Sequence, residues 1–371
     1  MSILSLISSF YKNIAKPILF KIDPEIVHEK MSSLAESLGT KKFTKKIIAK
    51  ILVVKDARLN QKIAGINFVN PLGLAAGFDY EAKFTQITPS VGFGFQSIGT
   101  ISNMPYAGNP RPLLGRLPKS KSLMVNKGFK NLGAIVTAKK LAKLKFALPI
   151  GVSIGRTNDA NLNQKQSIED IISAFRIFEN SKSQHTYYEL NISCPNLFGD
   201  VSFYPPQNLE ELLTAVDRLK LKRPLFVKMP INNSDREILS MLKVIAKHSP
   251  AGVILGNLQK DRKNPLLVKS EVRKFTVGNF SGKPTFDRSN QLISLVYKHY
   301  KKRFIIIGCG GVFSAEDAYE KIKRGASLVQ LITGMIFQGP QLISEINRDL
   351  LLFLQRDGYK NIKDAVGTKH V

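Results

Sequence analysis

One cysteine stands among polar side chains at the end of a β-prone apolar run. The run begins at Tyr187 and ends in Glu-Leu-Asn-Ile-Ser-Cys-Pro-Asn, residues 189–196. Because proline cannot continue a central strand, this pattern predicts a buried strand that delivers Asn191, Cys194 and Asn196 into a loop. Carboxamides offer donors and acceptors to a planar polar ligand, and a thiol beside them can take or give a proton. The alternative is a buried cysteine that acts as a small hydrophobic side chain.

The composition is that of a globular protein with a strong positive charge. The chain has 371 residues, of which 43% are hydrophobic and 22% charged, enough for one large core or two ordinary ones. Lys and Arg number 55 against 28 Asp and Glu, a net charge of +27. This charge either attracts an anion, such as nucleic acid, acidic lipid or a phosphorylated ligand, or forms a solvated lysine-rich surface.

The two cysteines, Cys194 and Cys309, lie far apart in the sequence. They show neither metal-type spacing nor the pattern of a secreted disulfide framework, so we expect no metal site and a cytoplasmic compartment. No run approaches the ~20 apolar residues that span a bilayer, and the N-terminus does not read as a signal peptide. We therefore expect a chain without transmembrane segments, which leaves contact with a membrane surface open.

Two short amphipathic helices are predicted at the N-terminus. Apolar residues recur at helical spacing from Ile3 to Ile14 in a segment that ends near Pro17. Asp23 and Pro24 predict the cap and first turn of a second helix, which runs to Gly39. Residues 41–55 follow as a linker with six lysines among apolar side chains. Such a unit, residues 1–55, either rests on an anionic membrane surface, packs on the main domain as a cap, or does both.

Eight apolar, β-rich runs alternate with stretches that can form helices. The runs are 68–76, 95–99, 149–154, 187–193, 224–229, 252–256, 303–307 and 328–332. This alternation predicts a parallel sheet covered by helices, and eight units fit a closed (β/α)8 TIM barrel over residues 56–371. An open doubly wound sheet is the alternative, but no Gly-x-Gly-x-x-Gly follows the first strand.

Nearly every predicted strand ends in glycine or a polar residue. Such strand ends form the active site of a barrel, and bare glycines after the seventh and eighth strands suit a phosphate. Lys228 ends the fifth strand between apolar neighbours, so we expect a buried cation that faces the ligand. Together these features predict a site for a phosphorylated flavin.

The sequence resembles the membrane-associated, quinone-using dihydroorotate dehydrogenases along essentially its whole length. The matching segments are Leu19 to Glu25 with His28, Asn70 to Asp79, Gly108 to Pro112, Asn191 to Asn196, Ser281 to Pro284, Gly308 to Gly311 and Gly325 to Gln330. The resemblance implies an FMN enzyme that oxidises dihydroorotate to orotate and passes the electrons to a quinone. It also implies that the N-terminal helices form the quinone tunnel and rest on the cytoplasmic side of the cell membrane as a peripheral unit.

The resemblance also assigns roles to individual residues. It places Cys194 at the position of the catalytic base. The FMN-binding positions are Ala76, Gly77, Thr100, Ser153, Asn191, Lys228, Gly256, Gly282, Gly310, Thr333 and Gly334. The substrate positions are Tyr80, Asn126, Lys127, Gly128, Phe129, Asn191, Asn196 and Asn257.

Several positions depart from the pattern of the quinone-using branch. Cys194 stands where that branch has Ser, and Leu197 stands where it has Thr. The two changes are coherent, because a hydroxyl needs a relay partner to act as a base whereas a thiolate does not. Cysteine at this position is typical of the soluble branches that use fumarate or NAD.

Other departures concern the ligand pockets. Tyr80 replaces an expected Lys, and Val125-Asn126 replaces an expected Asn-Arg pair. Lys83 and Lys127 are the candidates for the missing cation, and Asn126 is the candidate for the missing Asn. Three further replacements are Ser153 for Asn, and Gly256 and Leu258 for Thr.

Three other functions compete with this interpretation. Cys194 suggests the same oxidation with fumarate as acceptor. The positive charge suggests an RNA-acting flavin reductase of the dihydrouridine synthase type, but only a closing helix to about Gln355 and a short tail follow Gly334, so we expect no nucleic acid partner. A non-catalytic flavin-binding scaffold at the membrane is the last alternative.

Overall fold

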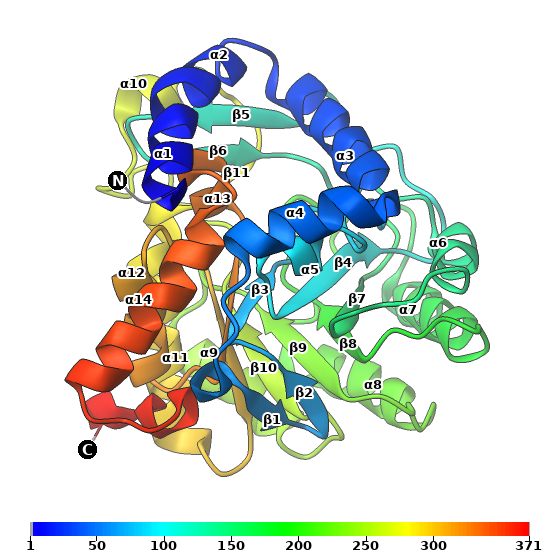
Figure 1. Ribbon diagram of the computed structural model, residues 1–371. Coiled ribbons are helices and arrows are strands. Elements are labelled where there is room, and N and C mark those ends of the chain that lie inside the picture. The colour runs from blue at the N-terminus through cyan, green and yellow to red at the C-terminus, as the bar shows by residue number, and fades with distance from the viewer. Residues whose placement is uncertain (1–2, 371) are drawn as a thin grey trace.

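Eight parallel strands close into a barrel in the computed structural model, which describes residues 3–370 (Figure 1). Each predicted run supplies one barrel strand: β3 (Leu72–Leu74), β4 (Phe95–Ile101), β7 (Ile150–Ile154), β8 (Tyr187–Asn191), β9 (Leu225–Met229), β10 (Gly252–Leu255), β12 (Ile305–Cys309) and β13 (Leu328–Leu331). Helices cover the outside of the barrel: α5 (Thr88–Val91), α6 (Ala134–Leu141), α7 (Gln164–Glu179), α8 (Pro206–Asp217), α9 (Asp235–Ile245), α11 (Phe286–Tyr300), α12 (Ala315–Lys323) and α14 (Leu342–Arg356). Two further helices lie at the mouth of the barrel: α10 (Lys269–Val272) and α13 (Thr333–Gln338). The predicted (β/α)8 barrel is confirmed, and the closed strand order excludes an open sheet.

Side chains fill the barrel interior in layers. At the bottom, the rings of Phe95, Tyr187 and Phe226 pack together, and Gly73 and Gly151 leave room because an added Cβ would meet a ring at 2.3 Å and 2.2 Å respectively. The next layer is polar and fully buried, with hydrogen bonds among Ser97, Glu189 and Gln330. Since side chains alternate along a strand, the inward positions of β8 are Tyr187, Glu189 and then Asn191 at the mouth.

An antiparallel hairpin closes the bottom of the barrel. Its strands are β1 (Gln61–Ile63) and β2 (Ile66–Phe68), and the Phe68 ring lies 5.4 Å from that of Phe95. The prediction of one strand over 68–76 is therefore wrong in its bounds. Phe68 belongs to β2, and the barrel strand begins only at Leu72.

A small antiparallel sheet stands above the mouth of the barrel. It pairs β5 (Leu114–Leu117), β6 (Ser122–Val125) and the two-residue strand β11 (Asn279–Phe280), and its edge lies beside α1 and α3 in Figure 1. The sequence pattern did not indicate this sheet. The sheet brings the segment after β4 next to the segment after β10, two parts of the chain far apart in sequence.

The N-terminal residues are almost entirely helical. The helix α1 (Ile3–Phe10) continues through a π-helical turn, Tyr11–Ala15, into α2 (Lys16–Leu19). In that turn Lys16 donates to the Tyr11 carbonyl, and this wider turn precedes Pro17, which has no N–H to donate. As predicted, Asp23 caps α3 (Pro24–Thr40) by accepting from two backbone N–H groups of its first turn.

The predicted linker over 41–55 is wrong, because residues 42–52 form the helix α4 (Lys42–Leu52). Its apolar residues recur at helical spacing and bury Leu52, while Lys42, Lys46 and Lys50 are exposed to solvent. Sequence reasoning read the lysine content as a linker and missed this periodicity. Within residues 3–370, no helix is both long and apolar enough to cross a membrane.

Candidate active site

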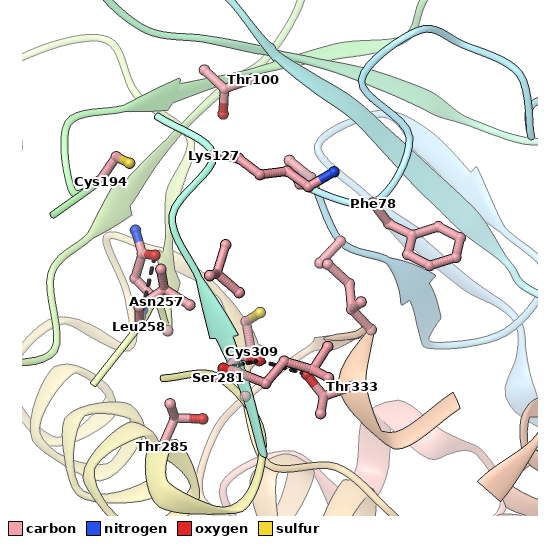
Figure 2. Close-up of a pocket in the computed structure, with 18 of the residues that line it drawn as sticks. Phe78, Thr100, Lys127, Cys194, Asn257, Leu258, Ser281, Thr285, Cys309 and Thr333 are labelled. Atoms are coloured by element: carbon pink, nitrogen blue, oxygen red, sulfur yellow. Dashed lines mark hydrogen bonds between the residues drawn. The ribbon is translucent and has the colours of Figure 1, made fainter. Parts of the chain in front are cut away.

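A cavity opens at the carboxyl end of the barrel, between the strand ends and α3. The space between its lining atoms amounts to about 1220 Å³, open solvent at the mouth included. Of the residues predicted for the site, all but two line this cavity; the exceptions are Ser153 and Asn126. Figure 2 shows that the labelled side chains come from opposite walls, with Cys194 and Asn257 across the space from Phe78. A site gathered from distant segments is therefore present where the strand ends predicted it.

Amide and hydroxyl side chains form a connected chain along one wall. The Asn191 amide donates to Thr100 Oγ1 at 2.8 Å, and its carbonyl oxygen accepts from the Ser193 backbone and hydroxyl. The Asn257 amide then donates to Ser193 Oγ at 2.5 Å. Thr100 Oγ1 also lies 2.9 Å from Ser153 Oγ, which places Ser153 behind the wall rather than on it. These bonds fix the orientation of the Asn191 and Asn257 carboxamides.

Cys194 lies in the loop that follows β8. Burial raises the pKa of its thiol to about 11, although a hydrogen bond from the Asn196 backbone and the charges of Lys228 and Arg156 oppose this rise. The group is therefore a thiol in most molecules at neutral pH. It can accept a proton only from the small thiolate fraction, which grows with pH.

The floor of the cavity suits a flat anionic ligand. Lys228 is the last residue but one of β9, lines the cavity, and has no hydrogen-bond or ion-pair partner within residues 3–370. At Gly77 a side chain would enter the open space, since only Ile332 Cδ1 comes near an added Cβ, at 3.9 Å. The glycines that bare the backbone on this side are Gly256, Gly282, Gly310, Gly311 and Gly334. An unpartnered buried cation beside bare backbone fits a phosphorylated ring cofactor.

A cluster of charged and aromatic groups joins α3 to the cavity. Lys127 Nζ lies 3.2 Å from Glu25 Oε2 and 3.1 Å from the Tyr80 hydroxyl, with the Tyr80 ring centre 4.4 Å away. Lys130 Nζ also contacts Glu25, at 3.1 Å. His28 stacks on Tyr80, and burial lowers the pKa of His28 to about 3, so that its ring is neutral at physiological pH.

Comparisons with known proteins agree with this geometry. The family model for dihydroorotate dehydrogenase matches residues 58–354. The chain belongs to the dihydroorotate dehydrogenase family. Curated relatives named dihydroorotate dehydrogenase (quinone) include one from Trichodesmium erythraeum, 32% identical over 97% of this chain and 98% of the relative. Another, from Christiangramia forsetii, is 35% identical over 92% of this chain and 98% of the relative.

A solved structure gives the same result at the level of the fold. The crystal structure of DHODH from Eimeria tenella in complex with ferulenol superimposes with a TM-score of 0.80 at 28% identity, covering 94% of this chain and 96% of that one. The protein is thus an oxidoreductase of the dihydroorotate dehydrogenase type.

Two residues predicted for the dihydroorotate dehydrogenase site lie outside the cavity wall. Ser153 bonds to Thr100, as described above. Asn126 turns away toward the loop before β5, where its amide donates to the carbonyls of Pro110 and Pro112. Its carbonyl oxygen accepts from Asn109, and the side chain does not line the cavity. It therefore does not stand in for the missing Asn in this structure.

Sequence reasoning also missed several residues of the cavity wall. Cys309 lies between two glycines at the end of β12, a position that the pattern of strand ends already marked. Thr285 follows the Ser281 to Pro284 segment, and Ser281 Oγ lies 2.9 Å from Thr333 Oγ1 (Figure 2). Leu114 and Leu123 carried no signal, because the small sheet that presents them was not predicted.

Asn109 connects the segments that surround Cys194. Its amide donates to Asn126 Oδ1 and to the Asn196 carbonyl, at 3.1 Å and 2.9 Å. Its own carbonyl oxygen accepts from Tyr106 and Asn158, at 2.7 Å and 2.8 Å. One buried side chain therefore holds the loop of Cys194 against two other loops of the dihydroorotate dehydrogenase barrel.

We expect Asn109→Ala to slow flavin reduction about 10- to 100-fold and to lower the free energy of unfolding by about 2 kcal/mol, because it leaves buried partners unsatisfied. Anaerobic stopped-flow and thermal unfolding of the flavin-loaded protein measure the two effects. Asn361→Ala is the matched control, since Asn361 makes a similar set of bonds far from the cavity. A normal reduction rate in Asn109→Ala would contradict the positioning role.

Proposed function

We propose that the protein oxidises dihydroorotate to orotate on a bound FMN, with Cys194 as the base and a quinone as the electron acceptor. One observation carries the proposal: a single cavity contains the thiol among carboxamides, Lys228, which has no partner among the described residues, and His28 of the N-terminal helices. The family match supports the same reaction.

The residues divide the chemistry between them. The amide N–H groups and carbonyls of the substrate ring are hydrogen-bond donors and acceptors. They would bind to the carboxamides of Asn191, Asn196 and Asn257. The Cys194 thiolate would take the proton from the ring carbon next to the carbonyl carbon. A bound FMN would supply the acceptor for the hydride that leaves the neighbouring carbon. Lys228, with Ala76, Gly77, Thr100, Gly282, Gly310, Thr333 and Gly334, would hold the cofactor.

Part of the cavity wall is apolar. Leu114 and Leu123 from the small sheet and Ile336 from α13 form it, whereas Lys127 and Lys130 lie near His28. A hydrophobic quinone ring fits the apolar part of the wall. This wall supports a quinone as acceptor, although Cys194 is typical of the fumarate-using branch.

The exposed surface of the N-terminal helices α1 to α4 supports an acceptor quinone that resides in the membrane. Large apolar side chains on α1 to α4 lie exposed rather than packed: Ile3, Leu6, Phe10, Ile14, Ile18, Ile26, Met31, Leu34, Phe43 and Ile47. Lysines of the same helices would meet anionic headgroups. We propose that residues 1–55 form the membrane-facing unit, that residues 56–371 form the catalytic barrel, and that the protein lies peripherally on the cytoplasmic side of the membrane.

We expect Ile14→Ser with Ile18→Ser to weaken binding to anionic phospholipid vesicles by about 100-fold, because two apolar side chains no longer enter the lipid. Vesicle co-sedimentation measures the change. The matched control is Val69→Ser with Leu352→Ser, since Val69 and Leu352 are 56% and 60% exposed, as Ile14 and Ile18 are at 51% and 58%, but lie outside α1 to α4. Equal loss in both double variants would contradict a membrane-facing unit.

Steady-state turnover tests the choice of acceptor. With dihydroorotate as donor, we expect rapid turnover with a short-chain quinone and negligible turnover with fumarate, both measured anaerobically on the full chain in detergent. Turnover with fumarate alone would move the protein to the soluble type of chemistry and leave the oxidation of dihydroorotate in place.

A further inference from the structure

The proposed substrate brings a negative charge into the cavity. Dihydroorotate carries a carboxylate, and a buried carboxylate needs a cation or several hydrogen bonds to offset its desolvation. Among the residues that line the cavity in the described part of the chain, Lys127, Lys130 and Lys228 are the cationic ones. Lys228 lies at the floor among the glycines proposed for the cofactor, which leaves the two lysines after β6 for the substrate.

Sequence reasoning left Lys83 and Lys127 as alternatives for this cation, and the structure separates them. Lys83 pairs with Glu81 at 2.5 Å and does not line the cavity. Lys127 is buried, lines the cavity and lies over the ring of Tyr80, the residue that replaces the expected lysine. The amino group of Lys127 is therefore the cation that lies nearest to Tyr80, which occupies the position of the expected lysine.

In the structure, however, the Lys127 amino group is engaged by the cap. It lies 3.2 Å from Glu25 Oε2 and turns toward Phe78, away from Cys194 (Figure 2). Glu25 has a second partner in Lys130, at 3.1 Å. Lys127 can therefore leave with the Glu25 carboxylate still paired to Lys130 through Oε1, and loss of every cation from this buried carboxylate would cost several kcal/mol. The four-carbon stem of lysine allows such a rotation without backbone movement.

We propose that Lys127 binds the substrate carboxylate and that it exchanges Glu25 of α3 for this partner when the substrate enters. The inference rests on the proposed function and adds to it the residue that recognises the anionic end of the substrate. It also links the occupancy of the substrate site to an ion pair between the barrel and the N-terminal helices.

The test compares two ligands that differ only in the carboxylate. Orotate and uracil share the pyrimidine ring, and the absorbance change of the bound flavin reports the dissociation constant of each. We expect Lys127→Met to weaken orotate binding about 10- to 100-fold and to leave uracil binding unchanged. Lys127→Arg should restore most of the orotate affinity, and Lys83→Met, the control, should match the wild type for both ligands.

A second measurement needs no substitution. Burial lowers the pKa of Lys127 to about 8 against the opposing charge of Glu25; Glu29, Lys130, Tyr80 and His28 are the other titratable groups around it. Because Lys127 is charged below that pH and neutral above it, the orotate dissociation constant should stay level to about pH 8 and then rise, while that of uracil stays level.

The outcomes distinguish a failure of the role proposed for Lys127 from a failure of the proposed oxidation of dihydroorotate. Equal losses for orotate and uracil in Lys127→Met, or no loss at all, would overturn the role of Lys127 while leaving dihydroorotate oxidation intact. A wild-type protein whose bound flavin responds to neither orotate nor dihydroorotate would overturn the proposed function, and the inference with it.

Discussion

Cys194→Ala should reduce the rate of flavin reduction by dihydroorotate by about 10³- to 10⁴-fold, the upper range for loss of a positioned general base. The cysteine is the only residue of its loop that combines a titratable group with a place on the cavity wall, and the Asn109 network holds that loop in position. Anaerobic stopped-flow at 450 nm, the flavin absorbance band, measures the rate. Flavin content should be unchanged, because the thiol is not assigned to cofactor binding.

The matched control is Cys309→Ala, since Cys309 is the other cysteine and lines the same cavity. We expect this variant to keep the wild-type rate within a few-fold. Equal losses in the two variants would mean that shape rather than proton transfer explains the effect.

The pH dependence of the same rate follows from the raised pKa of Cys194. Because this pKa is about 11, the thiolate is a small fraction at lower pH, and that fraction grows about tenfold for each unit by which the pH increases. The rate at saturating dihydroorotate should therefore climb from pH 6 to pH 9 without reaching a plateau. A rate that is level across this window would contradict a thiolate base in the reactive complex.

Lys228→Met should yield a protein that is purified largely without flavin. The ammonium group has no protein partner within residues 3–370 and faces the glycine-lined floor, so its proposed partner is the cofactor. Loss of a hydrogen bond to a charged group costs about 1.5–3 kcal/mol, which weakens FMN binding by about 10- to 150-fold. Quenching of FMN fluorescence by the apoprotein measures the dissociation constant.

The control for this substitution is Lys243→Met on α9, which removes an exposed lysine far from the cavity. It should retain a full complement of flavin. Thermal unfolding of both apoproteins guards against misfolding, and Lys228→Met should melt no lower than the wild-type apoprotein because it removes an uncompensated buried charge. Full flavin content in Lys228→Met would contradict the assignment.

The barrel could be predicted from sequence because parallel strands are buried on both faces and so appear as apolar runs at regular intervals. The runs at 95–99 and 187–193 illustrate this, and both became barrel strands. The small sheet escaped because β11 has only two residues and pairs with β6, more than 150 residues away. The helix α4 was not predicted because its many lysines are also typical of a linker. Its apolar residues have helical spacing, but packing against the rest of the protein is needed to stabilise that helix.

Site residues could be predicted where the direction of the barrel strands determines their position. They were predicted less well where their position depends on the hydrogen-bond partners of individual side chains. Strand ends placed Asn191, Lys228 and Gly310 on the cavity, since all strands of such a barrel end at one face. The orientation of Asn126 depends instead on Asn109 and on the loop before β5. The choice between Lys83 and Lys127 likewise depended on which carboxylate each one meets, which no local pattern encodes.

The most direct test of the account is an anaerobic titration of the purified, flavin-loaded protein with dihydroorotate. We expect stoichiometric bleaching of the flavin absorbance and formation of orotate, followed by recovery of the absorbance when a short-chain quinone is added. A bound flavin that dithionite reduces but dihydroorotate does not would contradict the account. It would show that the replacements at Tyr80, Val125 and Leu258 have changed the substrate of this barrel.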